Sequence, residues 1–231
     1  MFSRNSASSR AIPTSKLIER VEREPAVPLE WGRNKPGMSA SEELSQEEAA
    51  DGLTEWLCAR DHAVAHAKRL LEFGVHKQIL NRLLEPFMWH TVIVTATEWA
   101  NFFYLRTGAT AQPEIRQAAE RMREALRASQ PGPVEHGSWH LPLIQADERD
   151  LALDTRKKIS AARCARVSYL THTGTRDVAK DIELCERLMS DGHLSPFEHV
   201  ATPSDDASEC ANFVGWMQLR RTVEATALFV S

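Results

Sequence analysis

Residues 193–199 read His-Leu-Ser-Pro-Phe-Glu-His and place two imidazoles and a carboxylate within seven positions. Such groups are common metal ligands. Their spacing argues against a metal, because zinc motifs keep both histidines on one helical face, whereas Pro196 interrupts a helix between His193 and Glu198. The cysteines supply no ligand nearby, so we expect no metal. The run predicts a polar turn that lines a ligand pocket and leads into a strand over residues 197–201.

A second polar run, residues 111–116, reads Ala-Gln-Pro-Glu-Ile-Arg and marks the start of a helix, since proline is favoured in a first helical turn. Arg116 then lies where a cation opposes the helix dipole, at a cost of roughly a few tenths of a kcal/mol. Two interpretations stay open. Either Arg116 and the helix start face an anion, or Arg116 pairs with Glu114, Glu120 or solvent.

The beginning of the chain is rich in serine and arginine, and residues 3–10 read Ser-Arg-Asn-Ser-Ala-Ser-Ser-Arg. Guanidinium forks and hydroxyls are the groups that bind a phosphate monoester. The same composition is typical of a solvated, disordered terminus or of a transit peptide. Composition alone therefore leaves both phosphate binding and disorder open.

Hydrophobic periodicity predicts mostly helices elsewhere, with a few strands, so the chain is α+β or mixed α/β. The apolar run over 91–105 is interpreted as a buried helix, although Val92-Ile93-Val94 alone would suit a strand. The other expected elements are a short helix capped by Ser15, a long one from Ser41 or Ser45 to Gly74, a helical piece over 76–84 stopped by Pro86, a helix from Pro113 to Leu126, a short strand or extended segment over 139–144, a buried segment over 159–170 and an amphipathic one over 177–191.

The bulk composition is that of an ordinary globular protein. The chain has 231 residues, a formal net charge of -4 and 42% hydrophobic residues, so we expect a single domain over 1–231. There is no basic excess to indicate nucleic acid, and no apolar run of the roughly 20 residues that a membrane span needs. Neither partner is expected. The four cysteines form no Cys-x-x-Cys pair, which favours a reducing, cytoplasmic setting.

Together these runs resemble the flavin-dependent thymidylate synthase family. The family signature is R-H-R-x-x-S-x-N-x-x-S-x-R-Y, and the chain matches its second half. The family's other matching segments are L-R followed by A-Q-x-E-I-R, then A-R-V-S, and then G-H-x-S-P-F-E-H. In this chain the matches are Ser3, Asn5, Ser8 and Arg10 in the signature, and residues 105–116, 165–168 and 192–199 in the other segments.

The resemblance implies an enzyme that converts dUMP to dTMP, with methylenetetrahydrofolate as the carbon donor and NADPH reducing a bound FAD. It implies an α+β fold with an antiparallel sheet flanked by several helices. It also implies a homotetramer whose active sites form at subunit interfaces. In such an enzyme FAD supplies the hydride and the protein supplies binding and orientation.

Carried over position by position, the resemblance implies two catalytic residues. Arg116 stabilises the ionised pyrimidine, because catalysis places fixed charge where negative charge develops, and Ser8 polarises the uracil. The implied dUMP-binding residues are Asn5, Ser6, Ser8, Arg10 and Arg116. The implied FAD-binding residues are Arg106, His193, Ser195, Glu198 and His199.

The chain departs from the family pattern in order and in extent. It begins inside the signature, without the His-Arg pair, and the G-H-x-S-P-F-E-H segment follows the signature where the common arrangement has it first. We expect a divergent, phage-like branch and a chain truncated at its N-terminus. Ser6, Ala11 and Thr97 stand where the family has Glu, Tyr and Arg. The candidate replacement groups are Gln218, Arg220 and Arg221.

Three other hypotheses follow from these departures and from the composition. In the first, the chain is an inactive homologue that binds nucleotide or assembles with an intact partner. In the second, it is a helical binding module without catalysis. The third, a cysteine-dependent thymidylate synthase, needs a Pro-Cys-His triplet, which the sequence lacks. Cys164 and Cys185 are expected in the core instead.

Overall fold

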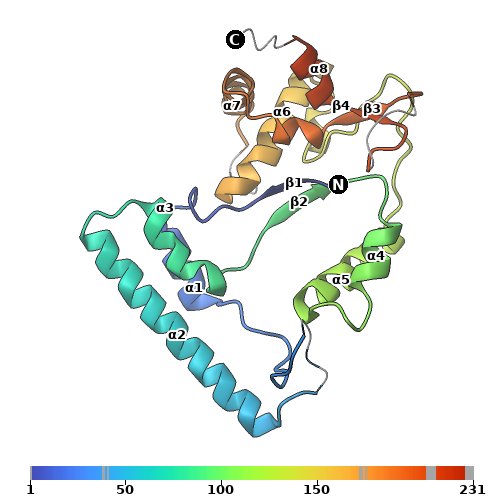
Figure 1. Cartoon of the computed structure of the whole chain (residues 1–231). Helices are drawn as coiled ribbons and strands as arrows, with labels where there is room; N and C mark the ends of the chain where they lie inside the picture. Colours follow the sequence, from blue (N-terminus) through green and yellow to red (C-terminus); the bar gives the residue numbers. More distant parts are fainter. Residues whose placement is uncertain are drawn as a thin grey trace. The chain divides into compact units, whose positions relative to one another are not determined.

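The computed structural model describes residues 2–37, 40, 42–171, 174, 176–206 and 212–226. Helices dominate and the strands form antiparallel pairs, which confirms the α+β class (Figure 1). The elements, with 3₁₀ helices labelled η, are β1 (Ser3–Ser6), α1 (Thr14–Arg23), α2 (Gln46–Glu72), α3 (Lys77–Leu80), η1 (Asn81–Phe87), β2 (Val92–Thr95), α4 (Ala100–Arg106), α5 (Pro113–Ala128), η2 (Ala146–Glu148), α6 (Leu153–Arg166), η3 (Val167–Tyr169), α7 (Val178–Ser190), η4 (Ser195–Glu198), β3 (Ala201–Pro203), β4 (Trp216–Gln218) and α8 (Leu219–Thr226).

Two antiparallel strand pairs join distant parts of the sequence. β1 pairs with β2, so that Ser3 lies opposite Thr95, and β3 pairs with β4, so that Ala201 lies opposite Gln218. The first half of the serine- and arginine-rich run, Ser3–Ser6, is therefore a strand, and the interpretation of the run as a disordered terminus is wrong. Alternation along β1 buries Ser3 and Asn5 and leaves their neighbours more accessible.

The chain divides into two compact units. The first comprises Met1–Ser8, His90–Glu98 and Gly132–Ser231, and the second comprises Ser9–Trp89 and Trp99–Pro131. The expectation of one domain over 1–231 stays a prediction.

The core of the first unit forms between α6, α7 and α8 and the segment before β3. Ala161 and Ala162 of α6 present small side chains, which let Cys185 of α7 approach closely, and Phe197 and Val200 fill the remaining space. The buried segment expected over 159–170 is confirmed for residues 159–165, which are all buried in α6. The amphipathic segment over 177–191 is confirmed as α7. Because Phe197 belongs to this core, the polar turn around it has a fixed position.

The second unit contains α1 to α5 and η1 (Figure 1). Ser45 is the start of the long helix α2: its hydroxyl accepts from Glu48 N at 3.2 Å, and the Glu48 carboxylate accepts from Ser45 N at 2.9 Å. This reciprocal pair satisfies amides that the first helical turn leaves open. Gly74 ends the helix at a φ of +75°, a conformation that glycine adopts without strain.

Two helix predictions were wrong in detail. Residues 91–105 are not one buried helix but β2 followed by α4, because Val92 to Thr95 find backbone partners on β1. The strand interpretation of Val92-Ile93-Val94 is thus the correct one. Ser15 does not cap α1, which begins at Thr14 after Pro13 and has no side-chain cap.

Three boundary predictions were also wrong. Pro86 lies inside η1 and does not stop the helical piece. The strand expected over 197–201 begins only at Ala201, because the fixed φ of Pro196 suits the helical turn η4. In the segment over 139–144, the structure pairs only His140, through a single bridge to Ala201.

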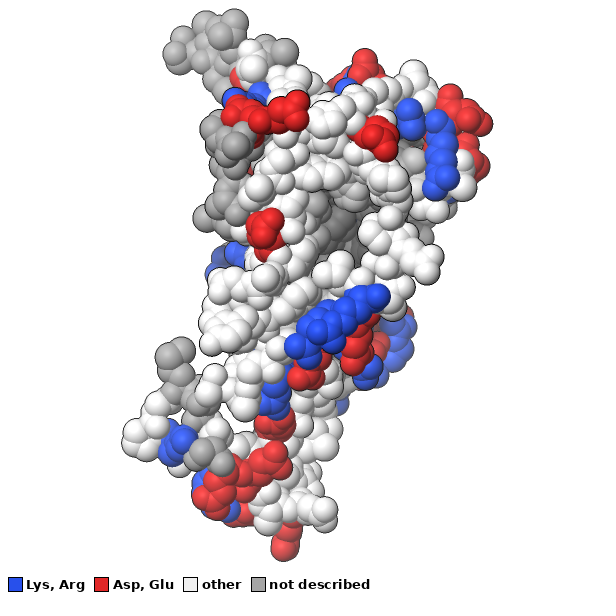
Figure 2. Space-filling view, turned by 90° about the vertical axis from the view of Figure 1, so that its right-hand side faces the viewer, with Lys and Arg blue, Asp and Glu red and all other residues white. Residues whose placement is uncertain are grey.

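Acidic and basic side chains lie beside one another on the face drawn in Figure 2 and form no broad field of one sign. This mixture agrees with the small net charge of -4. Among the helices of the described residues, none combines the length and the apolar character that crossing a membrane requires.

Candidate functional site

Three of the sequence motifs meet within the first unit. β1, which carries part of the signature, packs against both η3 and η4. The amide of Ser8 donates to the carbonyl of Ser168 at 3.0 Å, and Ser168 is the serine of the A-R-V-S segment. The fold thus brings the signature, the A-R-V-S segment and the turn over 193–199 together, although the last of them lies far along the chain.

Gln218 ties two of these segments to the end of β4. Its side-chain Nε2 donates to Ser3 Oγ at 2.9 Å and to the carbonyl of Glu198 at 2.8 Å. Ser3 lies 215 positions away in the sequence and is only 5% exposed. A single amide group therefore fixes β1 relative to η4. The sequence suggested Gln218 only as a replacement ligand group, and its bridging position was not predicted.

Glu198 is held by an arginine and does not point freely into solvent. Arg220 Nη1 donates to Glu198 Oε1 at 2.5 Å, while Arg220 Nε donates to Glu224 Oε1 at 2.8 Å. Hydrogen bonds to Glu224 and Glu198 raise the pKa of Arg220 above its usual value, so this guanidinium is charged. The pair anchors η4 to α8.

His199 is fully buried. Its Nδ1 shares a hydrogen bond of 2.8 Å with Thr95 Oγ1 on β2, and its Nε2 has no partner in the part of the chain that the structure describes. Burial lowers the pKa of His199 to about 4, although the nearby charge of Glu198 acts in the opposite direction. The imidazole is therefore neutral near pH 7, and it fastens the turn to β2.

His193 and Ser195 are the accessible members of the same turn. Both side chains are exposed, and within the described residues neither side chain forms a hydrogen bond. The main chain at His193 is fixed, since its amide donates to the carbonyl of Leu188 at 2.8 Å. The turn over 193–199 thus has two outward side chains, His193 and Ser195, above an anchored base formed by Glu198 and His199.

The signature residues differ in accessibility. Asn5 is buried on β1, Ser6 and Ser8 are half-buried, and Arg10 is exposed. Ser8 is the last signature residue in the first unit, and Ser9 and Arg10 belong to the second. There, Asn81 Nδ2 donates to the carbonyls of Ser9 at 2.7 Å and of Ile12 at 3.0 Å, which shapes the loop around Arg10.

Arg116 pairs with a carboxylate that sequence spacing did not reveal. Its Nη2 donates to Glu30 Oε1, from a segment 86 positions away, and its Nη1 donates to the carbonyl of Ala109 at 3.3 Å. Glu114 does not pair with Arg116 but accepts from the amide of Leu29 at 3.1 Å. A pocket of about 360 Å³ opens beside this pair. Pairing was one of the two open interpretations, but its partner is neither Glu114 nor Glu120.

Arg106 lies exposed in the last turn of α4, where a cation interacts favourably with the helix dipole. A neighbouring groove of about 450 Å³ lies between α4 and α5 and does not include Arg106. Arg123 lines this groove and donates to Thr107 Oγ1 at 3.1 Å.

Thr97 stands where the family pattern has an arginine, and the structure gives it a different task. Its amide and hydroxyl both donate to the carbonyl of Asn212, at 2.7 and 3.0 Å, and its hydroxyl accepts from the amide of Val214 at 3.0 Å. Thr97 therefore fastens the segment that leads into β4, which carries Gln218.

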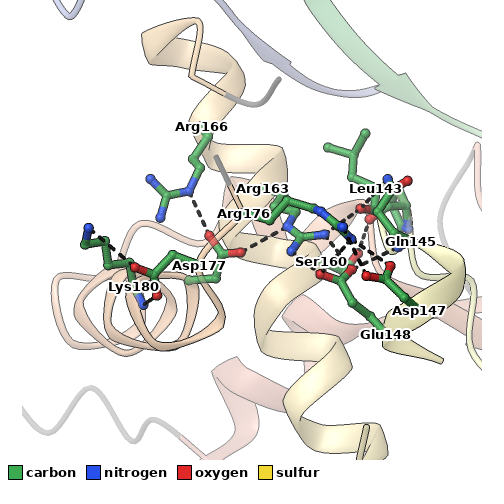
Figure 3. A network of polar contacts seen from close by, with 12 residues as sticks. Leu143, Gln145, Asp147, Glu148, Ser160, Arg163, Arg166, Arg176, Asp177 and Lys180 are labelled. Atoms are coloured by element: carbon green, nitrogen blue, oxygen red, sulfur yellow. Dashed lines mark hydrogen bonds and ion pairs between the residues drawn. The ribbon is translucent and has the colours of Figure 1, made fainter. Parts of the chain in front are cut away.

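The first unit contains a network of buried charges centred on Arg163 (Figure 3). Arg163 donates to both carboxylate oxygens of Glu148, at 2.6 and 2.7 Å, and its Nε donates to Asp181 at 3.0 Å. Arg166 donates to the other oxygen of Asp181 at 2.8 Å. The network joins α6, α7 and η2, and the A-R-V-S segment continues directly from α6. Sequence reasoning did not find it, since its members share no motif.

Two of the cysteines, Cys164 and Cys185, are buried. Burial raises the pKa of Cys164 to about 12 and that of Cys185 to about 11, so both thiols stay protonated, and both lie in the core as predicted. A search of the described residues gives no group of three His, Cys, Asp or Glu side chains placed to hold a metal ion.

A comparison with protein families finds a match for part of the chain. Residues 19–132 match the family Thy1, described as thymidylate synthase complementing protein. This stretch belongs to the Thy1 family, which is the flavin-dependent thymidylate synthase family that the motifs resemble and which implies a function in thymidylate synthesis. Comparisons with curated proteins and with solved structures gave no match.

Proposed function

We propose that the protein catalyses the reductive methylation of dUMP to dTMP. In this proposal methylenetetrahydrofolate gives the carbon, FAD carries the hydride, NADPH is the reductant, and a cytoplasmic homotetramer forms the sites. The observation that carries the proposal is the convergence of three motifs in one unit, through the Ser8–Ser168 hydrogen bond and the two hydrogen bonds of Gln218. The Thy1 match over residues 19–132 supports it independently.

Arg116 is the group we assign to the pyrimidine. A planar guanidinium presents a rigid fork of donors that suits the edge of a flat ring, and its fixed charge opposes the negative charge that develops there during methyl transfer. Ser6, Ser8 and Arg10 are the assigned nucleotide contacts that are at least partly accessible. Asn5 is buried, so its contribution is to hold β1 in shape.

The residues assigned to FAD divide into two groups. In the first unit, His193 and Ser195 present polar side chains that have no hydrogen-bond partner among the described residues, and in the second unit Arg106 presents an exposed cation. Each of these is a type of group that binds phosphates. Glu198 and His199 are bonded to Arg220 and Thr95, so we assign them the task of positioning the turn. When bound, FAD would supply the hydride chemistry that no side chain of the protein provides.

The deciding experiment is the visible absorption spectrum of the purified chain after FAD is added and the excess removed, with and without dUMP. We expect a retained flavin band that shifts when dUMP is added, followed by formation of dTMP in the presence of methylenetetrahydrofolate and NADPH. A chain that folds but retains no flavin and makes no dTMP contradicts the proposal.

Two variants locate the activity. Arg116→Ala should lower turnover about 100- to 1000-fold, the usual effect of removing a group that stabilises developing charge. Arg121→Ala is the matched control, because Arg121 lies on the same helix and pairs with Glu124 at the surface. Gln218→Ala should displace η4 and so weaken the retention of flavin. If this variant retains flavin as well as the wild type does, the turn over 193–199 does not bind FAD.

A further inference from the structure

In the second unit, Arg116 forms an ion pair with Glu30, a residue to which the proposed function gives no role. The guanidinium is 24% exposed and the carboxylate 39% exposed, so the pair lies at the wall of a pocket and is not sealed in a core. An ion pair at such a position is weak, because water screens it, and an incoming group can exchange with one partner. Glu30 thus occupies Nη2, one of the two terminal nitrogens that a planar ligand would need.

Glu30 is held in place by a segment that we call the strap, residues 29–33 together with 42–44. The amide of Arg33 donates to the carbonyl of Glu42 at 2.7 Å, and the amide of Leu44 donates to the carbonyl of Trp31 at 2.8 Å. A Cβ added at Gly32 would lie 2.1 Å from the Cβ of Ala40, so the backbone passes too closely for any side chain. The backbone of the strap is therefore fixed next to Glu30, which keeps the Glu30 carboxylate beside Arg116.

The pocket beside the pair has an unusual charge distribution. Its volume is about 360 Å³, which is enough for a single ring. Three carboxylates and one guanidinium supply its charged groups, and the neutral wall is made of small residues and the start of α5. A doubly charged phosphate in this pocket would be repelled by the carboxylates, whereas a flat ring that is neutral or carries one charge would not. The three carboxylates belong to Glu30, Glu42 and Glu43.

We propose that Glu30 is an internal counter-ion which a ligand must displace from Arg116, and that the acidic walls restrict this ligand to a flat, neutral or singly charged ring. The pocket thus selects the base end of a nucleotide and rejects its phosphate. This inference rests on the proposed function, and it adds Glu30 to that function as a residue that sets specificity.

The test compares the dissociation constants of dUMP for the wild-type chain and for Glu30→Gln by titration calorimetry. Because the neutral amide competes less for Arg116, dUMP should bind up to about fivefold more tightly to Glu30→Gln. Glu55→Gln is the matched control, since Glu55 is exposed on α2 and lies outside the pocket. Equal dUMP affinity in the wild type and in Glu30→Gln overturns the counter-ion role and leaves the proposed function standing.

A second variant tests whether the loss of any carboxylate that lines the pocket raises the affinity for dUMP. Glu43→Gln removes a carboxylate that lines the pocket without contacting Arg116, so it should change the affinity less than Glu30→Gln does. An equal gain in both variants overturns the specific role of Glu30. Thermal unfolding of each variant verifies that the strap is intact. If every variant unfolds like the wild type and none binds dUMP, the proposed function itself fails, and the inference fails with it.

Rejection of phosphate is tested separately with inorganic phosphate on the wild type and on Arg116→Ala. We expect the two proteins to bind phosphate equally, because phosphate should not reach Arg116. A loss of phosphate affinity in Arg116→Ala overturns the selection of the base end.

Discussion

Arg163 and Arg116 are both paired with carboxylates, yet they lie in opposite kinds of surroundings. Arg163 is 5% exposed and bonds two buried acids, one of them through two parallel hydrogen bonds (Figure 3). Arg116 is 24% exposed and bonds one half-exposed acid. In the first case no partner can leave without stranding a buried charge, whereas in the second water can replace either partner. The same chemical pair is therefore a structural joint in one unit and an exchangeable contact in the other.

Removing the buried arginine should have the largest effect. Arg163→Ala removes both guanidinium hydrogen bonds of Glu148 and one of the two of Asp181 and leaves these carboxylates buried, so we expect a loss of about 3–5 kcal/mol in the free energy of unfolding. Urea denaturation followed by circular dichroism measures it. Arg149→Ala, at an exposed position near η2, is the control. A loss below about 1 kcal/mol in the free energy of unfolding would mean that the network does not hold the first unit together.

A smaller, pH-dependent loss is expected for Glu148→Gln. The hydrogen bonds from Arg163 lower the pKa of Glu148 below its ordinary value of 4.5, so the unfolded chain binds this proton at a higher pH than the folded chain does. The stabilisation is complete above pH 4.5 and disappears as the pH falls through the lowered pKa. At pH 7 the variant should lose roughly 1.5–3 kcal/mol, as for other charge-assisted hydrogen bonds.

The pH series itself discriminates between the alternatives. The difference in unfolding free energy between the wild type and Glu148→Gln should shrink as the pH is lowered from 4.5. A difference that stays constant over that range would show that the shape of Glu148 stabilises the fold and its charge does not.

The smallest effect on stability should come from the exposed pair. Glu30→Gln should change the free energy of unfolding by less than about 1 kcal/mol, because exposed ion pairs contribute little. The same denaturation experiment measures this, and its result should not change with added salt by more than a few tenths of a kcal/mol. A loss as large as that of Arg163→Ala would make Arg116 a second joint and remove the contrast.

Sequence patterns predicted what depends on near neighbours. The start of a long helix at Ser41 or Ser45, the proline at the start of α5 and the amphipathic α7 all follow from spacing within a few positions. Residues 91–105 were misassigned because an apolar run suits a strand or a helix equally. Its pairing with β1 decided the outcome, and β1 is distant in the sequence.

The sequence predicted the motifs of the candidate site but not the residues that contact them. The turn over 193–199 and Arg116 were both found from the sequence, since their residue types occur in recognisable runs. Their partners were not, because Glu30 lies 86 positions from Arg116 and Gln218 lies 215 positions from Ser3. Such contacts depend on how the chain folds back on itself, and no local pattern records that.

The Gln218 bridge also has a consequence for synthesis of the chain. β1 leaves the ribosome early, but the side chain that completes its hydrogen bonds is made 215 positions later. At about 5–20 residues per second, that interval is on the order of ten to forty seconds. The second unit closes between residues 9 and 131 and has its partners long before then. Translation therefore imposes an order in which the signature strand can pair with β2 early but gains its contact with Gln218 only after β4 has been made.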